Sequence, residues 1–117
     1  MTDAEAAVAF PWLQDYWNTF GPFFARPPGG ESLAQVCERV YAFLQKIART
    51  MAGRRVLVVT HGGTLWCFRY VLERWTYEEA EERFRTEAIL NCSVTSYRYD
   101  DAVGRLALEG AGKVFWK

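Results

Sequence analysis

The segment Arg55-Val-Leu-Val-Val-Thr-His61-Gly-Gly-Thr-Leu65 is the stretch that decides the fold. Its apolar run, Val56 to Val59, leads through Thr60 into a histidine followed by two glycines. Because the run has no polar alternation, we expect residues 55–60 to form a strand covered on both faces, as in a parallel sheet flanked by helices.

The residues after this strand predict a strand, tight loop and helix unit. Gly62 and Gly63 let the backbone turn sharply and approach a ligand closely, and the apolar stretch 65–75 is long enough for the following helix. The loop would then present free backbone N–H groups and the positive end of the helix dipole, which suit a phosphate or carboxylate. The sequence therefore predicts an anion site beside His61.

Composition indicates one ordinary globular domain. The chain has 117 residues, of which 50% are hydrophobic and 24% charged, and its 14 basic and 14 acidic residues cancel. No stretch gathers the basic residues, so nothing favours nucleic acid or an anionic membrane as a partner. The acidic start lacks the pattern of a secretion signal and no apolar run approaches a spanning helix, so we expect a cytoplasmic location.

Helical and strand patterns alternate along the chain. A capping box at Ser32 to Gln35 opens the clearest amphipathic helix, and Thr76 opens another. We expect helices near residues 3–9, 12–20, 32–51, 64–74 and 77–86, and two strands at 93–99 and 105–109 joined by a hairpin loop over 100–104.

The N-terminal segment, residues 1–30, is rich in aromatic side chains and ends in a Pro/Gly loop. Its aromatic residues within a short span are Phe10, Trp12, Tyr16, Trp17, Phe20, Phe23 and Phe24. They either form a small core against the next helix or pack against another chain or a further part of the fold.

The single histidine and three cysteines limit the possible chemistry. One histidine excludes a multi-histidine metal site within the chain, and no G-x-S-x-G elbow accompanies it, so we expect no metal, no cofactor and no Ser-His-Asp triad. Cys37, Cys67 and Cys92 are an odd number without C-x-x-C spacing and are expected to be reduced core thiols.

Three motifs carry a resemblance to a known family. In order, they are Pro27-Pro-Gly-Gly-Glu-Ser32 before a helix, Val56-Leu-Val-Val-Thr-His-Gly-Gly63, and Asn91-Cys-Ser-Val-Thr-Ser-Tyr97. Together they resemble the C-terminal half of the histidine phosphatase superfamily, over residues 10 to 117. The resemblance implies an α/β fold, a truncated three-layer α/β/α phosphoglycerate-mutase-like domain with a mostly parallel central sheet, in a single domain over residues 1–117.

The same resemblance assigns roles to a few residues. His61 matches the family's second histidine, which hydrogen-bonds the phosphoryl group, and Gly62 matches the backbone donor beside it, with Gly63 completing the phosphate loop. Glu31 and Ser32 fall in a loop that borders the substrate entrance in the family, although Ser32 also fits a helix cap. Asn91 lies where the family often has a polar residue before its last strands.

Members of this family also carry an Arg-His-Gly motif whose histidine is phosphorylated during turnover. This chain has no Arg-His pair, because its only histidine follows Thr60. Two hypotheses remain open. The chain is either the phosphate-binding half of a split or truncated phosphatase or mutase, active only when an Arg-His-Gly segment completes it, or a non-catalytic anion-binding or self-association module. An Arg-His-Gly reading frame immediately upstream would favour the first.

Association is expected on physical grounds as well. Without a neighbouring strand, residues 55–60 would keep an apolar, unpaired edge that lacks protective charges or prolines. We therefore expect a homodimer that buries at least about 1,200 Å², or a complementing N-terminal half. The small-molecule partner would be a phosphorylated compound, inorganic phosphate or sulfate.

Overall fold

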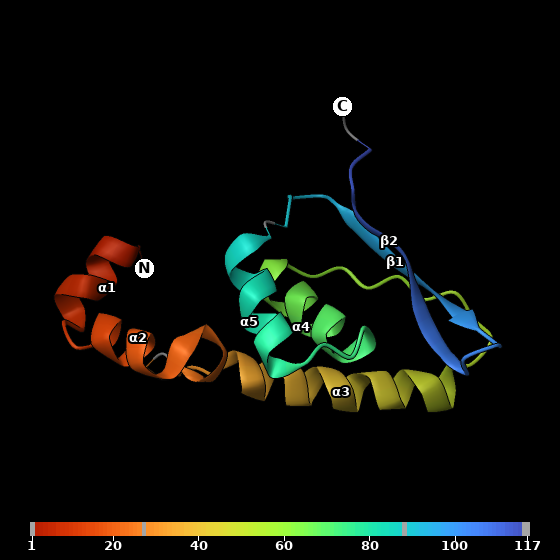
Figure 1. Cartoon of the computed structure of the whole chain (residues 1–117), viewed down its shortest axis with the longest axis horizontal. Coiled ribbons are helices and arrows are strands. Elements are labelled where there is room, and N and C mark those ends of the chain that lie inside the picture. Colours follow the sequence, from red (N-terminus) through yellow and green to blue (C-terminus); the bar gives the residue numbers. More distant parts are fainter. Residues whose placement is uncertain (1, 27, 88, 116–117) are drawn as a thin grey trace.

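The computed structural model of the chain describes residues 2–26, 28–87 and 89–115, in which five helices precede a β-hairpin (Figure 1). Their bounds are α1 Asp3–Ala9, α2 Leu13–Phe24, α3 Leu33–Thr50, α4 Gly62–Leu72, α5 Tyr77–Thr86, β1 Val94–Asp100 and β2 Arg105–Lys113. The chain is therefore a mixture of helix and strand, as expected. Pro27 of the first motif and the final two residues lie outside the described residues.

Side-chain caps fix where the helices begin. At the start of α3 the Ser32 hydroxyl accepts from the Gln35 backbone N–H at 3.2 Å, and the Gln35 side-chain oxygen accepts from the Ser32 N–H at 2.8 Å. This confirms the predicted capping box. At α5 the Thr76 hydroxyl accepts from the Glu79 N–H at 3.1 Å, so that helix also begins where its cap predicts.

Helix α2 continues past residue 20, where we expected it to end. Gly21 has φ +79°, which breaks the helical path, and a short further turn follows to Phe24. The predicted interruption is therefore a kink rather than a helix end. A side chain at residue 21 would also meet the Glu81 carboxylate, whose Oε1 lies 2.7 Å from an ideal Cβ.

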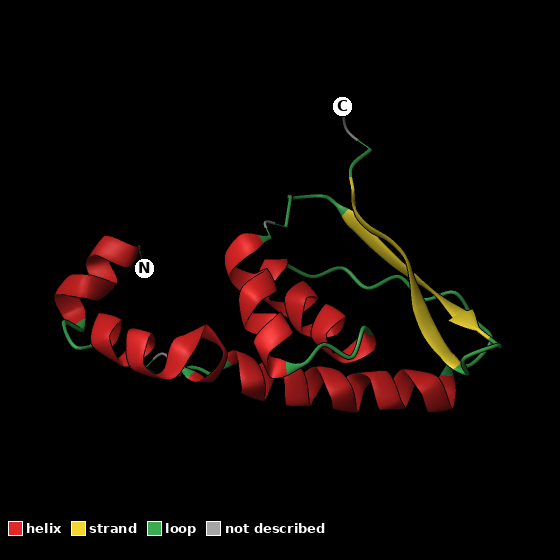
Figure 2. Ribbon diagram, in the orientation of Figure 1, coloured by secondary structure: helices red, strands yellow, loops and turns green. Residues whose placement is uncertain are grey.

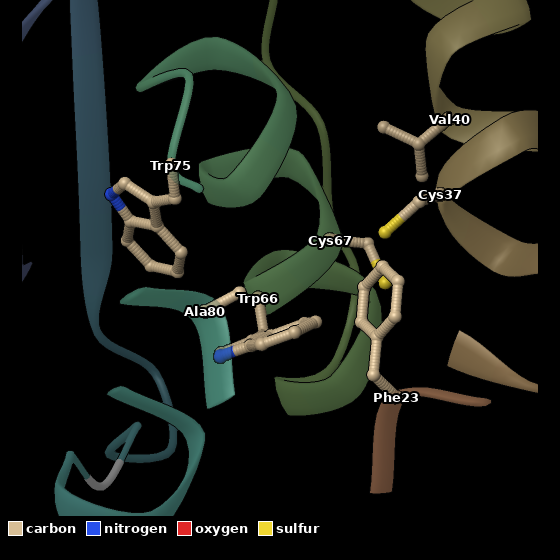
Figure 3. Packing of buried hydrophobic residues seen from close by; sticks show 7 residues of the cluster. All are labelled: Phe23, Cys37, Val40, Trp66, Cys67, Trp75 and Ala80. Atoms are coloured by element: carbon tan, nitrogen blue, oxygen red, sulfur yellow. The ribbon is translucent and has the colours of Figure 1, made fainter. Parts of the chain in front are cut away.

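The buried core lies between α2, α3, α4 and α5 (Figure 3). Trp66 is at its centre, with ring centroids 5.8 Å from Phe23, 6.1 Å from Trp75 and 5.3 Å from Phe84. Its buried members are Phe23, Cys37, Val40, Trp66, Cys67, Trp75 and Ala80. Of the N-terminal aromatic residues Phe23 enters this core, whereas Trp12, Phe20 and Phe24 remain more than half exposed.

The expected burial of residues 55–60 is wrong in this structure. The segment is a loop between α3 and α4 (Figure 2), and the relative exposures of Val56, Leu57, Val58 and Val59 are 42%, 85%, 43% and 88%. A strand needs a neighbour that exchanges backbone hydrogen bonds with it. Within the described part of the chain no other segment pairs with residues 55–60.

The sheet that the structure contains is the C-terminal hairpin. Strands β1 and β2 pair antiparallel, with Asp100 opposite Arg105 and Tyr97 opposite Leu108. The two predicted strands and their connecting loop are confirmed, with β2 extending to Lys113. A mostly parallel central sheet is not present among the described residues.

The molecule is extended for its length. Its radius of gyration is 16.3 Å, whereas a compact domain of this size has a value of about 13 Å. Helices α1 and α2 form an arm that projects from the remaining elements (Figure 1). This shape and the exposed apolar segment 55–60 both leave hydrophobic surface uncovered.

A partly buried polar network joins α4 to the hairpin and to the segment after α5. Glu73 accepts from Arg69 at 2.7 Å, from the Tyr97 hydroxyl at 2.7 Å and from the Trp75 indole at 3.3 Å. Arg69 also donates to Glu87 at 3.1 Å. The side chains of Arg69 and Glu73 are only 11% and 12% exposed. The network therefore fixes α4, which begins beside His61, against its neighbours.

The groups in this network shift one another's pKa values. Burial alone would raise the pKa of Glu73, but hydrogen bonds from Arg69 and Tyr97 outweigh it and hold that pKa below its usual value of 4.5. The hydrogen bond to Glu73 raises the pKa of Arg69, and burial together with the Glu73 carboxylate raises that of Tyr97. Glu73 is thus ionised and paired near neutral pH.

Glu73→Gln tests this network through the pH dependence of stability. Since the pKa of Glu73 is lowered on folding, its stabilisation is fully present above about pH 4.5 and is lost as the pH falls through the lowered value. We expect the variant to be about 1–3 kcal/mol less stable at pH 7, with the difference shrinking toward pH 3 in urea unfolding. Glu109→Gln, which breaks an exposed pair with Arg98, should change little at either pH.

Ser32→Ala tests whether Ser32 acts as a helix cap. We expect a loss of about 1 kcal/mol in unfolding free energy, because the N–H of Gln35 loses its acceptor. Ser96→Ala, in β1, is the matched control and should stay within about 0.5 kcal/mol of wild type. An unchanged stability in Ser32→Ala would contradict the capping role.

Candidate functional site

His61 lies at the N-cap of α4. Its backbone is extended, with φ −126° and ψ 173°, and its carbonyl accepts from the Leu65 N–H at 2.9 Å. The imidazole is exposed and caps no backbone N–H of the helix. The sequence predicted a strand, a tight loop at Gly62 and Gly63 and a helix near residues 64–74; in the structure the segment before His61 is a loop, and the helix begins two residues earlier, at Gly62.

Gly62 and Gly63 are the first two residues of α4. The first backbone N–H groups of a helix have no partner within it, so these amides are available to an anion. Neither glycine has positive φ. A Cβ at residue 62 would meet nothing within 4 Å, and one at residue 63 would meet only Leu33 Cδ2 at 3.9 Å. A side chain would therefore fit at either position without a close contact.

The predicted entrance loop, which contains Glu31 and Ser32, ends close to the start of α4. Leu33 approaches Gly63, and its carbonyl accepts a hydrogen bond from the Cys67 thiol at 3.7 Å, so the beginnings of α3 and α4 are neighbours. Glu31 is exposed and pairs with Arg39 at 2.7 Å. The hydroxyl of Ser32 is used by the α3 cap. Of these two residues, Glu31 has the more accessible side chain.

Asn91, the remaining predicted site residue, lies in the exposed turn that leads into β1. It has an interaction within the chain. Asn91 thus precedes β1, whereas His61 precedes α4.

The cysteines divide into a buried pair and an exposed residue. Cys37 and Cys67 are buried free thiols whose side chains face each other between α3 and α4 (Figure 3). The hydrogen bond between them raises the pKa of Cys37, and burial raises it further. The same hydrogen bond lowers the pKa of Cys67 and outweighs the opposite effect of burial. Cys92 is exposed, with φ +58° in the turn before β1. The expectation of three core thiols is therefore correct for two and wrong for Cys92, which a turn carries to the surface.

A cavity that sequence reasoning missed adjoins the same helix. It has a volume of about 310 Å³ and is bounded by α4, by the segment leading into β1 and by the end of β2. Leu65 and Arg69 contribute from α4, and the Ser93 hydroxyl is buried without a hydrogen-bond partner among the described residues. The i, i+4 spacing of Leu65 and Arg69 places both on one face of α4. His61 itself does not line the cavity.

Across the described ranges, no group of three or more His, Cys, Asp or Glu side chains could hold a metal ion. None of the helices in those ranges is long and apolar enough to cross a membrane.

Comparison with known proteins identifies relatives along most of the chain. The profile of the histidine phosphatase superfamily (branch 1) matches residues 1–110. The broad-range acid phosphatase DET1 of Saccharomyces cerevisiae is 36% identical over 98 residues, which is 78% of this chain and 28% of that protein. Phosphoglycerate mutase-like protein 4 of Arabidopsis thaliana is 41% identical over 76 residues, 64% of this chain and 30% of that protein.

A third relative is the 2,3-bisphosphoglycerate-dependent phosphoglycerate mutase of Rhizobium rhizogenes, 44% identical over 55 residues, 45% of this chain and 26% of that protein. No solved structure matches the chain significantly. The chain spans less than a third of the length of these three relatives. With a profile match over residues 1–110 and the Thr-His-Gly-Gly segment at the start of α4, the chain belongs to the histidine phosphatase superfamily.

Proposed function

We propose that this chain is the phosphate-binding half of a phosphoryl-transfer domain of the phosphatase or mutase type. The observation that carries the proposal is the exposed imidazole of His61 next to the free amides at the start of α4. Its ligand would be a phosphorylated small molecule or inorganic phosphate or sulfate. In the completed domain, residues 55–60 would join a mostly parallel central sheet within three α/β/α layers.

The chemistry of this site is electrostatic stabilisation of the transferring group. The His61 imidazole would hydrogen-bond one phosphoryl oxygen, and the amides of Gly62 and Gly63 would donate to others. Such donors stabilise the charge that spreads over the equatorial oxygens as the phosphoryl group moves. The positive end of the α4 dipole adds to this stabilisation.

The nucleophile must come from elsewhere. In-line transfer by this route needs one imidazole to attack phosphorus and separate donors around the oxygens. The chain has one histidine, which cannot do both. We infer that the isolated chain binds anions without catalysing turnover, and that a segment bearing a nucleophilic histidine completes the active site. Glu31, Ser32 and Asn91 remain candidates for the substrate loop.

A second candidate function is a non-catalytic anion-binding or self-association module. The exposed apolar segment 55–60 favours it. Adding a segment that contains Arg-His-Gly would distinguish the two functions. A phosphate-binding half would gain phosphatase activity, whereas a non-catalytic module would bind anions without gaining it.

Anion binding by His61 is tested directly with inorganic phosphate. We expect His61→Ala to weaken phosphate binding about ten- to hundredfold in calorimetric titration, corresponding to the about 1.5–3 kcal/mol of a charge-assisted hydrogen bond. Lys46→Ala, which removes an exposed cation from α3, is the control and should bind as wild type does. Equal binding by wild type and His61→Ala would overturn the assignment of His61.

Turnover of an aryl phosphate tests the missing nucleophile. The wild-type chain should hydrolyse it no faster than His61→Ala does, since neither has a second imidazole. A His61-dependent rate of about 1 per second or more would contradict this expectation and would show that another residue, or a second subunit, supplies the nucleophile.

A further inference from the structure

Two buried thiols meet between α3 and α4. The side chains of Cys37, on α3, and Cys67, on α4, point toward each other within the core (Figure 3). The exposed fractions of these residues are 6% and 0%, and both thiols are reduced in the structure. Because the two residues are far apart in the sequence, the packing of α3 on α4, and not a local turn, brings their sulfur atoms together.

Hydrogen bonds fix the direction of both thiols. The Cys37 thiol donates to the Cys67 sulfur, which is why their pKa values move in opposite directions. The Cys67 thiol donates in turn to the Leu33 carbonyl, with an Sγ···O distance of 3.7 Å. Removing one proton from the pair therefore leaves a thiolate beside a thiol, which is the arrangement that disulfide formation needs.

A cavity adjoins one of the two sulfurs. It has a volume of about 370 Å³, lies between the end of α2, α3 and α4, and is lined in part by Cys37, Tyr41 and Tyr70. A small oxidant in this cavity would contact Cys37, with Cys67 directly behind it. Since the pair lies inside the core that α3 and α4 form together, further segments packed around the chain would leave the two sulfurs side by side.

We propose that Cys37 and Cys67 are a redox-sensitive pair, which hydrogen peroxide oxidises to a disulfide and which a thiol reductant restores. Neither the pairing nor its test rests on the proposed function, because both thiols belong to the core and not to the phosphate site beside His61. A pair of cysteines that is reduced at rest and oxidised on demand is the form that redox-sensing disulfides take in reducing compartments.

The oxidation would proceed in two steps. Once the pair has lost one proton, the other can move along the hydrogen bond to Cys67, which places the thiolate on Cys37 at the cavity. This thiolate attacks one peroxide oxygen, the O–O bond breaks, and the hydroxide that leaves takes up a proton to become water. The Cys67 sulfur then attacks the sulfenic acid on Cys37. The S–S bond forms as the S–O bond breaks, and the proton of Cys67 leaves with hydroxide as a second water.

The disulfide would join α3 to α4 covalently. It would close a loop of about 30 residues, which contains the segment 55–60 and His61, and a crosslink of this span restricts the unfolded chain more than the folded one. Oxidation is therefore expected to stabilise the packing of α3 on α4. It would also hold the start of α4 against α3 when the connecting loop moves.

Mass spectrometry of the folded chain tests the bond. Cys92→Ser first removes the exposed thiol that would otherwise link two chains. After treatment of this variant with excess hydrogen peroxide, we expect the loss of both free thiols and of the mass of two hydrogen atoms, and dithiothreitol should restore both. Trypsin places Cys37 and Cys67 in separate peptides, so a joined peptide identifies the bond. Persistence of both free thiols under conditions that oxidise Cys92 in the wild-type chain would overturn the proposal.

Thermal unfolding tests whether the bond fits the folded structure. The oxidised Cys92→Ser chain should unfold at least about 5 °C above its reduced form, and dithiothreitol should abolish the difference. Cys37→Ala in the same background is the matched control, because it retains one core thiol and peroxide should not raise its unfolding temperature. A disulfide that lowers the unfolding temperature of Cys92→Ser would show that the folded chain does not place the two sulfurs for bonding, and would refute the redox-sensitive pair.

Discussion

The packing of Trp66 against residues from three other parts of the chain is the interaction on which the structure depends. Its ring contacts Phe23 after the kink in α2, Trp75 after α4, and Phe84 in α5. Since α4 begins at Gly62, directly after His61, and carries Trp66 just over one turn later, the same contact that builds the core also fixes the start of the helix. Arg69 and Glu73 then hold the far end of α4 against the hairpin and the segment after α5. The candidate site is therefore positioned by packing within α4 rather than by its own loop.

Local signals in the sequence predicted local structure well. The caps at Ser32 and Thr76 and the hairpin loop after Asp100 are short-range features, whose hydrogen bonds form within a few residues. The strand expected at residues 55–60 depends on partners far along the chain or on another chain. Its sequence predicts an extended path, but burial and pairing require neighbours that these described residues do not supply. Hydrophobic pattern alone cannot show whether such neighbours exist.

The candidate site likewise combines residues whose placement follows from local sequence with residues that only the tertiary fold brings together. His61, Gly62 and Gly63 are contiguous, so their place at the start of a helix follows from local sequence, whereas the strand expected before them is a loop in the structure. The network around Glu73 unites residues 69, 73, 75, 87 and 97. Sequence spacing does not reveal this set, because the tertiary fold brings residues 87 and 97 to α4. Ser32 has a local explanation as a cap, which its hydrogen bond with Gln35 supports. Asn91 lies in the turn before β1, far along the chain from the histidine.

The open connection between α3 and α4 also affects how the chain would respond to proteases. Arg54 and Arg55 adjoin an exposed stretch without backbone pairing, and proteases that cut after basic residues bind their substrates in such an extended form. A cut there would separate α3 from α4 in the chain but not in space, because Cys37 and Val40 of α3 share a buried core with Cys67. The nicked protein would remain a single non-covalent particle, with a new amino terminus a few residues before the histidine.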